Sequence, residues 1–313
     1  MSRRIRTPRE GALTPEILVA DGWADYSLLD SGDGRKLERF GRHILDRPDT
    51  QAIWSPSLSS VRWSTADARF LAGREEDGAG RWEATGRRAP EPWPIAYGPV
   101  RIEAQLTAFR HLGLFPEHQV HWNRVLAAVE QRARARVGNE PPTVLNLFGY
   151  TGMASLLPAA AGAKVTHVDA SKKAISWARA NQEMSGLSAA PIRWICDDAA
   201  RFAAREVRRG SRYDIIVLDP PKYGRGPKGE VWRLEEQLPQ LLTDCRALLD
   251  QRSSMLILTA YATHLSMLTL WRLVGDAFAD LDGTITAGEM ALREETTGRP
   301  LPTSLYVRWS RDA

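Results

Sequence analysis

Residues 144–152 read Val-Leu-Asn-Leu-Phe-Gly-Tyr-Thr-Gly. The run from Val144 to Phe148 is mostly apolar, which is typical of a short strand buried on both faces of a parallel sheet. Gly149 and Gly152 follow, and the lack of a Cβ at both positions would let the backbone approach a ligand closely. The glycines do not form the Gly-x-Gly-x-x-Gly pattern of dinucleotide-binding proteins. Taken alone, such a turn is also common between a strand and a helix.

From about residue 143 onward, strands and helices alternate along the chain. The apolar spacing predicts helices at about 117–137, 171–184, 233–249 and 263–280, and an alanine-rich helix that ends near 161. It predicts strands at about 144–148, 165–168, 192–196, 213–218, 255–259, 284–292 and 304–309. This alternation indicates an α/β fold, a Rossmann-like, doubly wound and mostly parallel sheet of seven strands.

The first third of the chain has a different pattern, with short strand-like stretches separated by turns. We expect residues 1–15 to be a disordered N-terminal lead. The recurring turn signals predict a small β-rich domain at residues 16–105, with strand-like stretches at 26–30, 51–54 and 61–63. Residues 106–313 then form the α/β domain. Most of the 11 tryptophans precede residue 130. Together with arginine they would form a surface for nucleic acid, or they would fill the core of the β-rich domain.

Carboxylates end the second, third and fourth of the predicted strands. Asp169, Asp198 and Asp219 occupy these positions. In a doubly wound sheet, a ligand binds beyond the carboxyl ends of the strands, beside the first strand. Asp169 is placed to accept hydrogen bonds from both hydroxyls of a ribose, and Asp198 is placed to read the edge of an adenine. Each acid alone is also typical of a helix N-cap, but their order together indicates a nucleoside-type cofactor.

The sequence Asp219-Pro220-Pro221 follows the fourth strand. Two prolines fix the backbone and form a rigid wall beside the predicted reaction site. Lys222 and Tyr223 come next and would line the reaction site. A wall of this kind suits a flat acceptor that must face the cofactor in line.

These motifs resemble a bacterial family of 23S ribosomal RNA methyltransferases, which includes a cytosine-C5 enzyme and the guanine-N7 half of a fused enzyme. The shared sequence motifs are residues 144–152, Val-Asp-Ala-Ser at 168–171 and Ala-Arg-Ala-Asn at 178–181. Residues 109–117 more loosely resemble the segment that these enzymes place over the cofactor. The resemblance covers roughly residues 100–310 and is most specific within 144–222.

The resemblance implies a class I methyltransferase that uses S-adenosylmethionine and has RNA, ribosomal RNA in particular, as its partner. It implies that the β-rich domain binds RNA. It also implies that Asp169 binds the ribose of the cofactor and Asp198 binds its adenine. Asp219 would belong to the wall at the methyl-transfer site. The candidate catalytic residues are Asp219, Pro220, Pro221, Lys222 and Tyr223. The candidate cofactor-binding residues are Phe115, Asn146, Phe148, Gly149, Tyr150, Thr151, Gly152, Asp169, Ala170, Ser171, Asp197, Asp198, Ala199 and Asp219.

One departure from the family changes the expected chemistry. Methylation of cytosine C5 needs a thiolate, which the cytosine-C5 relative carries just after the fifth strand. Residues 258–262 read Leu-Thr-Ala-Tyr-Ala and contain no cysteine. The two cysteines of the chain, Cys196 and Cys245, are expected to be inert core residues. A base nitrogen is therefore the expected acceptor.

Two polar segments are candidates for selecting the substrate. Residues 223–232 are glycine-rich and basic and end in Trp232, which suits a lid that contacts phosphate, or an ordinary solvated loop. Residues 293–303 lie between the last two predicted strands and would reach the same edge of the sheet.

Composition excludes several other classes of protein. Apolar residues make up 43% and charged residues 26% of 313, with a formal net charge of +4, which permits a nucleic-acid partner without requiring one. No apolar run is long enough to span a bilayer, no signal peptide is evident, and two cysteines make neither a disulfide framework nor a zinc site. We therefore expect a cytoplasmic protein with no metal and no membrane partner. Two alternatives remain open: a small-molecule methyltransferase, and a non-catalytic, RNA-associated protein that only binds the cofactor.

Overall fold

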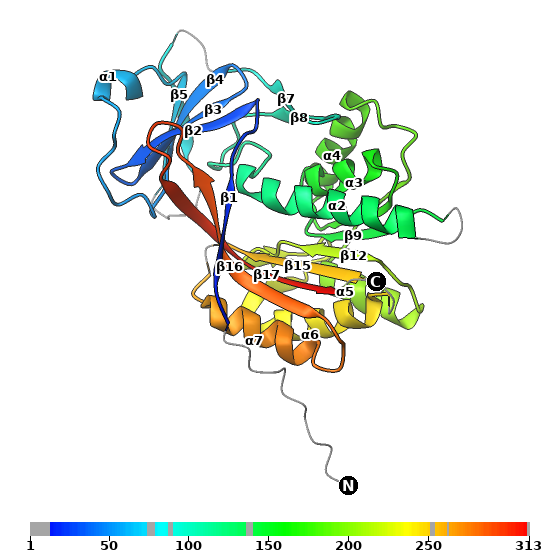
Figure 1. Ribbon diagram of the computed structural model, residues 1–313. Coiled ribbons are helices and arrows are strands. Elements are labelled where there is room, and N and C mark those ends of the chain that lie inside the picture. Colours follow the sequence, from blue (N-terminus) through cyan, green and yellow to red (C-terminus); the bar gives the residue numbers. More distant parts are fainter. Residues whose placement is uncertain are drawn as a thin grey trace.

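The computed structural model describes residues 13–73, 79–86, 90–135, 140–250, 254–261 and 263–311. Most of the predicted disordered lead, residues 1–12, lies outside the described residues. A large sheet with helices on both sides forms one part of the molecule, and smaller sheets form the other (Figure 1). The predicted α/β architecture is confirmed.

The large sheet has eight strands among the described residues, one more than predicted. Their order is β1-β16-β17-β15-β12-β9-β10-β11. β17 is antiparallel to both of its neighbours, whereas the other strand pairs are parallel. The bounds are β1 Glu16–Ala20, β9 Thr143–Leu147, β10 Lys164–Asp169, β11 Ile192–Cys196, β12 Ile215–Leu218, β15 Ser254–Ala260, β16 Thr284–Arg293 and β17 Pro300–Arg311.

β1 is the additional strand, and it corrects the predicted start of the β-rich domain. Residues 16–20 pair in parallel with β16 at the edge of the large sheet instead of joining the N-terminal sheet. The chain then crosses to the N-terminal sheet (Figure 1). Local sequence does not reveal this, because the partner strand lies near the other end of the chain.

Helices cover both faces of the large sheet. α2, α3 and α4 lie on one side, and α5, α6 and α7 lie on the other (Figure 1). A short 3-10 helix, η1, precedes α2. Their bounds are η1 Pro116–His118, α2 Gln119–Ala135, α3 Met153–Ala160, α4 Lys172–Met184, α5 Ala199–Arg208, α6 Leu234–Leu248 and α7 Met267–Ala277.

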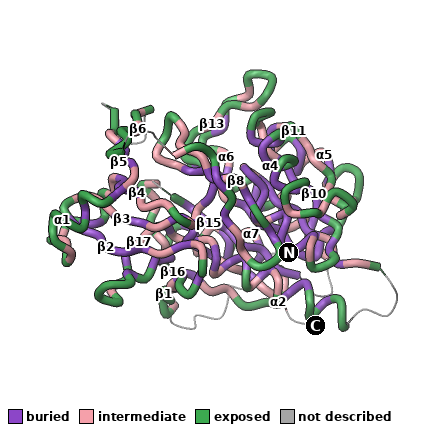
Figure 2. Tube along the Cα trace, turned by 90° about the horizontal axis from the view of Figure 1, so that it is seen from above, coloured by how far each residue is buried: buried purple, intermediate pink, exposed green. Residues whose placement is uncertain are grey.

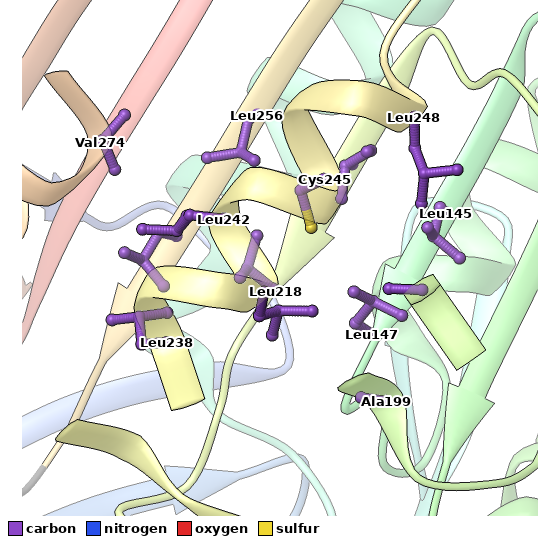
Figure 3. Packing of buried hydrophobic residues seen from close by; sticks show 14 of the residues in the cluster. Leu145, Leu147, Ala199, Leu218, Leu238, Leu242, Cys245, Leu248, Leu256 and Val274 are labelled. Atoms are coloured by element: carbon purple, nitrogen blue, oxygen red, sulfur yellow. The ribbon is translucent and has the colours of Figure 1, made fainter. Parts of the chain in front are cut away.

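The core on the α6 side shows why these residues form a helix. Leu238, Leu242 and Cys245 recur at helical spacing, so they share the face that packs against Leu218 and Leu256 of the sheet (Figure 3). All five side chains are fully buried. Burial raises the pKa of the Cys245 thiol, so the prediction that Cys245 is a core residue is confirmed.

The N-terminal part contains a five-stranded sheet in the order β2-β3-β4-β5-β6 and a two-stranded sheet of β7 and β8. A buried ion pair stabilises it: Arg47 donates two hydrogen bonds of 2.7 Å to Glu38. Arg47 also donates to the carbonyl of Arg110 (2.9 Å) and so ties this sheet to the segment before η1. The bounds are β2 Tyr26–Gly32, β3 Arg35–Phe40, β4 His43–Pro48, β5 Ala68–Leu71, β6 Arg81–Ala84, β7 Trp93–Tyr97 and β8 Val100–Ala104.

Two strand-like stretches of this part were predicted wrongly. Residues 51–54 are not in a strand, and residues 61–63 belong to a short helix, α1 (Ser60–Trp63). Figure 2 shows α1 at the edge of the molecule, largely exposed. Trp63 is its one buried residue, and its Nε1 donates to the buried carboxylate of Asp30 (2.9 Å). This distant contact outweighs the strand preference of Val61 and Trp63.

The tryptophans of the N-terminal part mainly fill its core. Trp23, Trp63 and Trp93 are buried, and Trp93 donates to the carbonyl of Phe40 (3.0 Å). Their abundance therefore follows from packing. No helix in the described part of the chain is long and apolar enough to cross a membrane.

The β16/β17 hairpin joins the two parts of the molecule. Its far end, residues 293–300, reaches the N-terminal sheet (Figure 1), where Leu28 forms a bridge with Glu294. The Glu294 carboxylate is buried and accepts hydrogen bonds from the backbone and the hydroxyl of Ser31 (2.7 and 2.8 Å). Within the segment predicted to select substrate, Glu294 thus forms an internal contact, whereas residues 295–298 are exposed.

Candidate functional site

The loop after β9 has an unusual backbone conformation. Phe148 and Tyr150 have φ values of +58° and +50°. Non-glycine residues seldom adopt this region, and each such residue costs on the order of 1–3 kcal/mol. The Tyr150 N–H donates to Asp169 (2.9 Å), and Asn181 of α4 donates to the carbonyl of Thr151 (2.9 Å). The surrounding structure thus holds this loop in a single strained shape.

Gly149 and Gly152 are required by packing in this loop. A Cβ at Gly149 would lie within 2.9 Å of three ring atoms of His167. Gly152 has a φ of +95°, and a Cβ there would lie 3.1 Å from the Cβ of Ala178. The prediction that both positions need glycine agrees with these distances, but contact with β10 and α4 is the reason that the structure gives.

A buried polar chain lies behind the loop. Asn146 donates to the hydroxyl of Ser155 (2.9 Å), and this hydroxyl lies 2.9 Å from His167 Nδ1. Burial lowers the pKa of His167 to about 3, so its ring is neutral at physiological pH. Among the described residues, its Nε2 has no hydrogen-bond partner. The loop therefore packs against an uncharged, hydrogen-bonded group of buried polar side chains.

An open cleft lies above this loop. Of the predicted residues, Asn146, Thr151 and Asp219 reach it from different elements, together with Phe115, Phe148, Gly149, Tyr150 and Gly152. The sequence did not single out the other lining residues, which are Gly113, Leu114, His118, Trp122, Met153, Ala154 and Val217. Gly113 and Leu114, like Phe115, belong to the segment 109–117 that was expected to cover the cofactor. That segment could therefore have identified Gly113 and Leu114 as lining residues.

Phe115 and Gly113 show how this covering segment is held. The Phe115 ring lies 5.8 Å from the ring of Tyr150, and the hydroxyl of Thr151 donates to the carbonyl of Gly113. A Cβ at Gly113 would lie 2.6 Å from Trp177 Cη2. The segment before η1 is thus packed onto the loop after β9 and onto α4.

Asp169 lies at the tip of β10, next to the cleft. Its two oxygens accept hydrogen bonds from the N–H groups of Tyr150 (2.9 Å) and Ser171 (2.8 Å). Burial raises its pKa, although these two bonds oppose the shift. The neighbouring Ser171 caps α4 by accepting from Ala174 N (3.2 Å). Asp169, Ala170 and Ser171 are not part of the cleft lining among the described residues.

Asp197 and Asp198 lie at the adjacent strand tip, since Asp169 is opposite Cys196 in the register of β10 and β11. Asp198 is the N-cap of α5 and accepts from Arg201 N (2.9 Å). Asp197 forms an ion pair with Arg205 (2.8 Å). Ala199 begins α5 and is buried. In the described structure these residues make contacts that stabilise α5 and do not line the cleft.

Asp219 lies in the cleft opposite His118. Asp219 Oδ2 is 3.6 Å from His118 Nε2. Burial raises the pKa of Asp219, His118 lowers it, and the charge of Glu117 raises it. His118 comes from η1, and nothing in its local sequence marked it as a partner of Asp219.

The wall that follows Asp219 is anchored on both sides. Pro220 is buried, and the carbonyl of Pro221 accepts from Trp232 Nε1 (2.7 Å). Lys222 and Tyr223 are exposed, and the carbonyl of Lys222 accepts from Leu234 N (3.0 Å). The wall is therefore fixed, while the two candidate residues after it face solvent.

Neither cysteine lines the cleft. Cys196 is exposed at the tip of β11, so its prediction as a core residue was wrong. Its thiol is 3.6 Å from the carbonyl of Ala170 and does not line the cleft. In the described part of the chain, no group of three or more His, Cys, Asp or Glu side chains is arranged to hold a metal ion.

Comparisons with known proteins agree with this geometry. No family model matches the chain. The chain is 31% identical over 169 residues to the ribosomal RNA large subunit methyltransferase K/L of Shewanella frigidimarina, a match that covers 53% of this chain and 22% of that protein. It is 26% identical over 205 residues to the ribosomal RNA large subunit methyltransferase K of Neisseria meningitidis, covering 63% and 54%. The chain thus spans between about a fifth and a half of the length of these curated relatives.

A solved structure gives a match over nearly the whole chain. The SAM-dependent methyltransferase of Agrobacterium tumefaciens is 47% identical, with a TM-score of 0.89 and coverage of 95% of this chain and 94% of that one. This chain therefore belongs to the S-adenosylmethionine-dependent methyltransferases, which confirms both the predicted cofactor and the predicted class of enzyme.

Proposed function

We propose that the protein transfers a methyl group from S-adenosylmethionine to a nitrogen of a base in ribosomal RNA. The observation that carries this proposal is the position of Asp219. Its carboxyl lies in the same cleft as the strained loop after β9 and is followed by the Pro220-Pro221 wall. The names of the curated relatives, which are ribosomal RNA methyltransferases, support RNA as the acceptor.

The residues around the cleft fit the cofactor. The strained loop of Phe148 to Gly152 would lie against it, and Asp169 would accept hydrogen bonds from its ribose hydroxyls. Both oxygens of Asp169 are already oriented by backbone N–H groups, and a carboxylate oxygen can accept more than one hydrogen bond. Asp197, Asp198 and the start of α5 would face the adenine from the next strand tip.

The acceptor would lie between the cofactor and the wall. The cofactor, when bound, supplies a methyl group activated by a sulfonium. Asp219 would accept a hydrogen bond from an N–H of the acceptor base and so orient the nitrogen lone pair in line. Pro221 is exposed and would hold the plane of the base, while the buried Pro220 keeps the backbone rigid with little entropy left to lose. Methylation of cytosine C5 by a thiolate is disfavoured because neither cysteine lines this cleft.

The test uses protein incubated with S-adenosylmethionine that carries a labelled methyl group. Undermodified ribosomal RNA is the acceptor in one reaction and a small-molecule extract in the other, and mass spectrometry of nucleosides identifies the methylated atom. We expect label in RNA, on a nitrogen. Label only in the extract would identify a small-molecule methyltransferase, and cofactor binding without any label would identify a non-catalytic binding protein; either result contradicts the proposal.

Two variants test the assigned roles. Asp169→Ala should abolish cofactor binding in calorimetry, because it removes the ribose acceptor and a support of the loop. Asp219→Ala should keep cofactor binding and lose transfer. Asp276→Ala, an exposed carboxylate on α7, is the matched control and should change neither measurement.

A further inference from the structure

The segment after the wall, for which the sequence left a lid or a solvated loop open, contains a β-hairpin. β13 (Tyr223–Arg225) pairs antiparallel with β14 (Val231–Arg233). Tyr223 is opposite Arg233, and Arg225 is opposite Val231. Residues directly opposite each other project from the same face, and faces alternate along a strand. Tyr223, Arg225, Val231 and Arg233 therefore share one face, which we call the outer face, and Gly224 and Trp232 share the inner one.

The inner face fixes the hairpin to the candidate active site. Trp232 is buried, and its Nε1 donates to the carbonyl of Pro221 (2.7 Å). Its ring centre lies 4.9 Å from that of Phe148, which lines the cleft. A Cβ at Gly224 would lie 3.5 Å from Pro221 Cγ. The orientation of the outer face is therefore set by contacts with Phe148 of the cleft and with Pro221 of the wall.

The tip of the hairpin is braced by an ion pair. Glu230 accepts hydrogen bonds at its carboxylate from Lys228 N and at its carbonyl from Gly226 N (2.8 Å each). The same carboxylate pairs with Arg201 of α5. Its negative charge is thus paired with a residue outside the hairpin.

The outer face combines cations with an exposed ring. Tyr223 is 50% and Val231 42% exposed, and Arg225 is exposed. Arg233 lies 3.4 Å from the exposed Glu236, a contact that adds little stability. Lys222 and Lys228 are exposed at the two ends of the hairpin. Guanidinium groups beside an exposed ring form the chemistry that binds single-stranded nucleic acid, through phosphate contacts and base stacking.

We propose that the outer face binds the backbone of single-stranded RNA next to the nucleotide that is methylated. Arg225 and Arg233 contact phosphates, and Tyr223 stacks on a neighbouring base. This inference rests on the proposed function, and it identifies the part of the protein that would bind the RNA strand beside the methylated nucleotide. An acidic protein segment would use the arginines but not the ring, so the observations favour RNA.

The test measures how binding of a fluorescent 12-nucleotide oligouridylate depends on salt concentration. Each phosphate contact to a single strand contributes about 0.7 to the slope of log affinity against log salt. The double variant Arg225→Gln/Arg233→Gln should therefore make the slope shallower by about 1.4. The control is Arg134→Gln/Arg272→Gln, which removes two exposed arginines that pair with acids on their own helices, α2 and α7. The control should leave the slope as in the wild type.

The ring is tested separately. Tyr223→Ala should weaken oligonucleotide binding by about tenfold without changing the slope, because stacking carries no counterion release. Tyr223→Phe should restore the affinity. Calorimetry with S-adenosylmethionine verifies that every variant still folds.

Each possible result leads to a decision. If the wild type binds the oligonucleotide and the hairpin double variant has the same slope, or the control pair has an equal effect, this inference fails and the proposed function stands. If oligoglutamate of the same length displaces the oligonucleotide and Tyr223→Ala has no effect, the face binds acidic protein segments instead. If the wild type has no salt-dependent affinity for the oligonucleotide and transfers no label to RNA, both the inference and the proposed function fail.

Discussion

The carboxyl of Asp219 experiences opposing electrostatic effects from its neighbours. Burial raises its pKa, the imidazole of His118 at 3.6 Å lowers it, and Glu117 raises it. If Asp219 accepts a hydrogen bond from the acceptor, it acts as a carboxylate, and activity is lost as the pH falls through its pKa. Because that pKa lies above the ordinary value for an aspartate, the loss should begin at a higher pH than for an unperturbed group.

Replacement of His118 tests this relation at the scale of one residue. His118→Gln removes the neighbour that lowers the pKa of Asp219, so the acidic limb of the kcat/KM profile should move to higher pH. His43→Gln changes a histidine of the N-terminal sheet and should leave the profile in place. An acidic limb that does not move in His118→Gln would mean that Asp219 does not act as a carboxylate beside His118.

Gly149 offers a second test at this scale. In Gly149→Ala the new methyl group would collide with the His167 ring, which Ser155 holds in place. Overpacking of this kind typically costs about 1–3 kcal/mol, and the loop after β9 would shift. Urea unfolding should show the loss of stability, and calorimetry should show weaker cofactor binding. Gly86→Ala, where a Cβ meets no atom within 4 Å, is the control, and wild-type behaviour of Gly149→Ala would contradict the packing argument.

The hairpin of β13 and β14 depends, as an element, on Trp232. Trp232→Ala removes the buried ring from Phe148 and the hydrogen bond to Pro221, a change that typically costs about 3–5 kcal/mol. We expect amide hydrogen exchange to become faster over 223–233 and to stay unchanged in α4. Trp232→Phe keeps most of the ring contact and should have a smaller effect. Equal protection of the hairpin in the wild type and Trp232→Ala would show that Trp232 is not its anchor.

Elements of the large sheet could be predicted because their signals are local. The buried strand β9 and the carboxylates that follow the next three strands are readable from spacing alone, and the resemblance added the cofactor. The errors concern elements whose partners are distant in the chain. β1 pairs with β16, and α1 forms where Trp63 reaches Asp30. No window of neighbouring residues contains this information.

The same difference between local signals and distant contacts applies to the residues of the candidate site. Asp219 could be placed at the cleft because it follows a recognisable strand, and Asp169 could be placed at the end of the neighbouring strand. The role of Asp169 toward a ribose remains a prediction. His118 was missed because its contact with Asp219 joins elements that are far apart in sequence. The hydrogen bond of Asp198 to Arg201 N is the N-cap that the sequence also allowed. A role in reading adenine remains a prediction for that residue.

At the scale of the whole molecule, one buried carboxylate connects the large sheet to the N-terminal sheet. Glu294 of the β16/β17 hairpin accepts from Ser31 and from Arg299 Nε (2.9 Å), and the guanidinium of Arg299 lies over the ring of Trp54 at 5.7 Å. Burial alone would raise the pKa of Glu294. Hydrogen bonds from Arg299, Thr297 and Ser31 oppose it, and the pKa is lowered. The contact therefore favours the charged form.

Glu294→Gln should weaken this connection. The substitution keeps the shape but removes the negative charge that pairs with Arg299. Because Arg299 is 35% exposed and still has the buried Asp30 carboxylate at 3.7 Å, we expect a loss of about 1.5–3 kcal/mol, the range for hydrogen bonds to charged groups. Because the folded-state pKa is lowered, the stabilisation is present above the unfolded-state pKa of about 4.3 and is lost as the pH falls through the folded-state value. Urea unfolding should thus show a large difference from the wild type at pH 7 that narrows below about pH 4. Glu289→Gln, which changes an exposed glutamate on β16, should change stability by less than about 0.5 kcal/mol. If Glu294→Gln unfolds like the wild type at pH 7, other contacts must hold the hairpin against the N-terminal sheet.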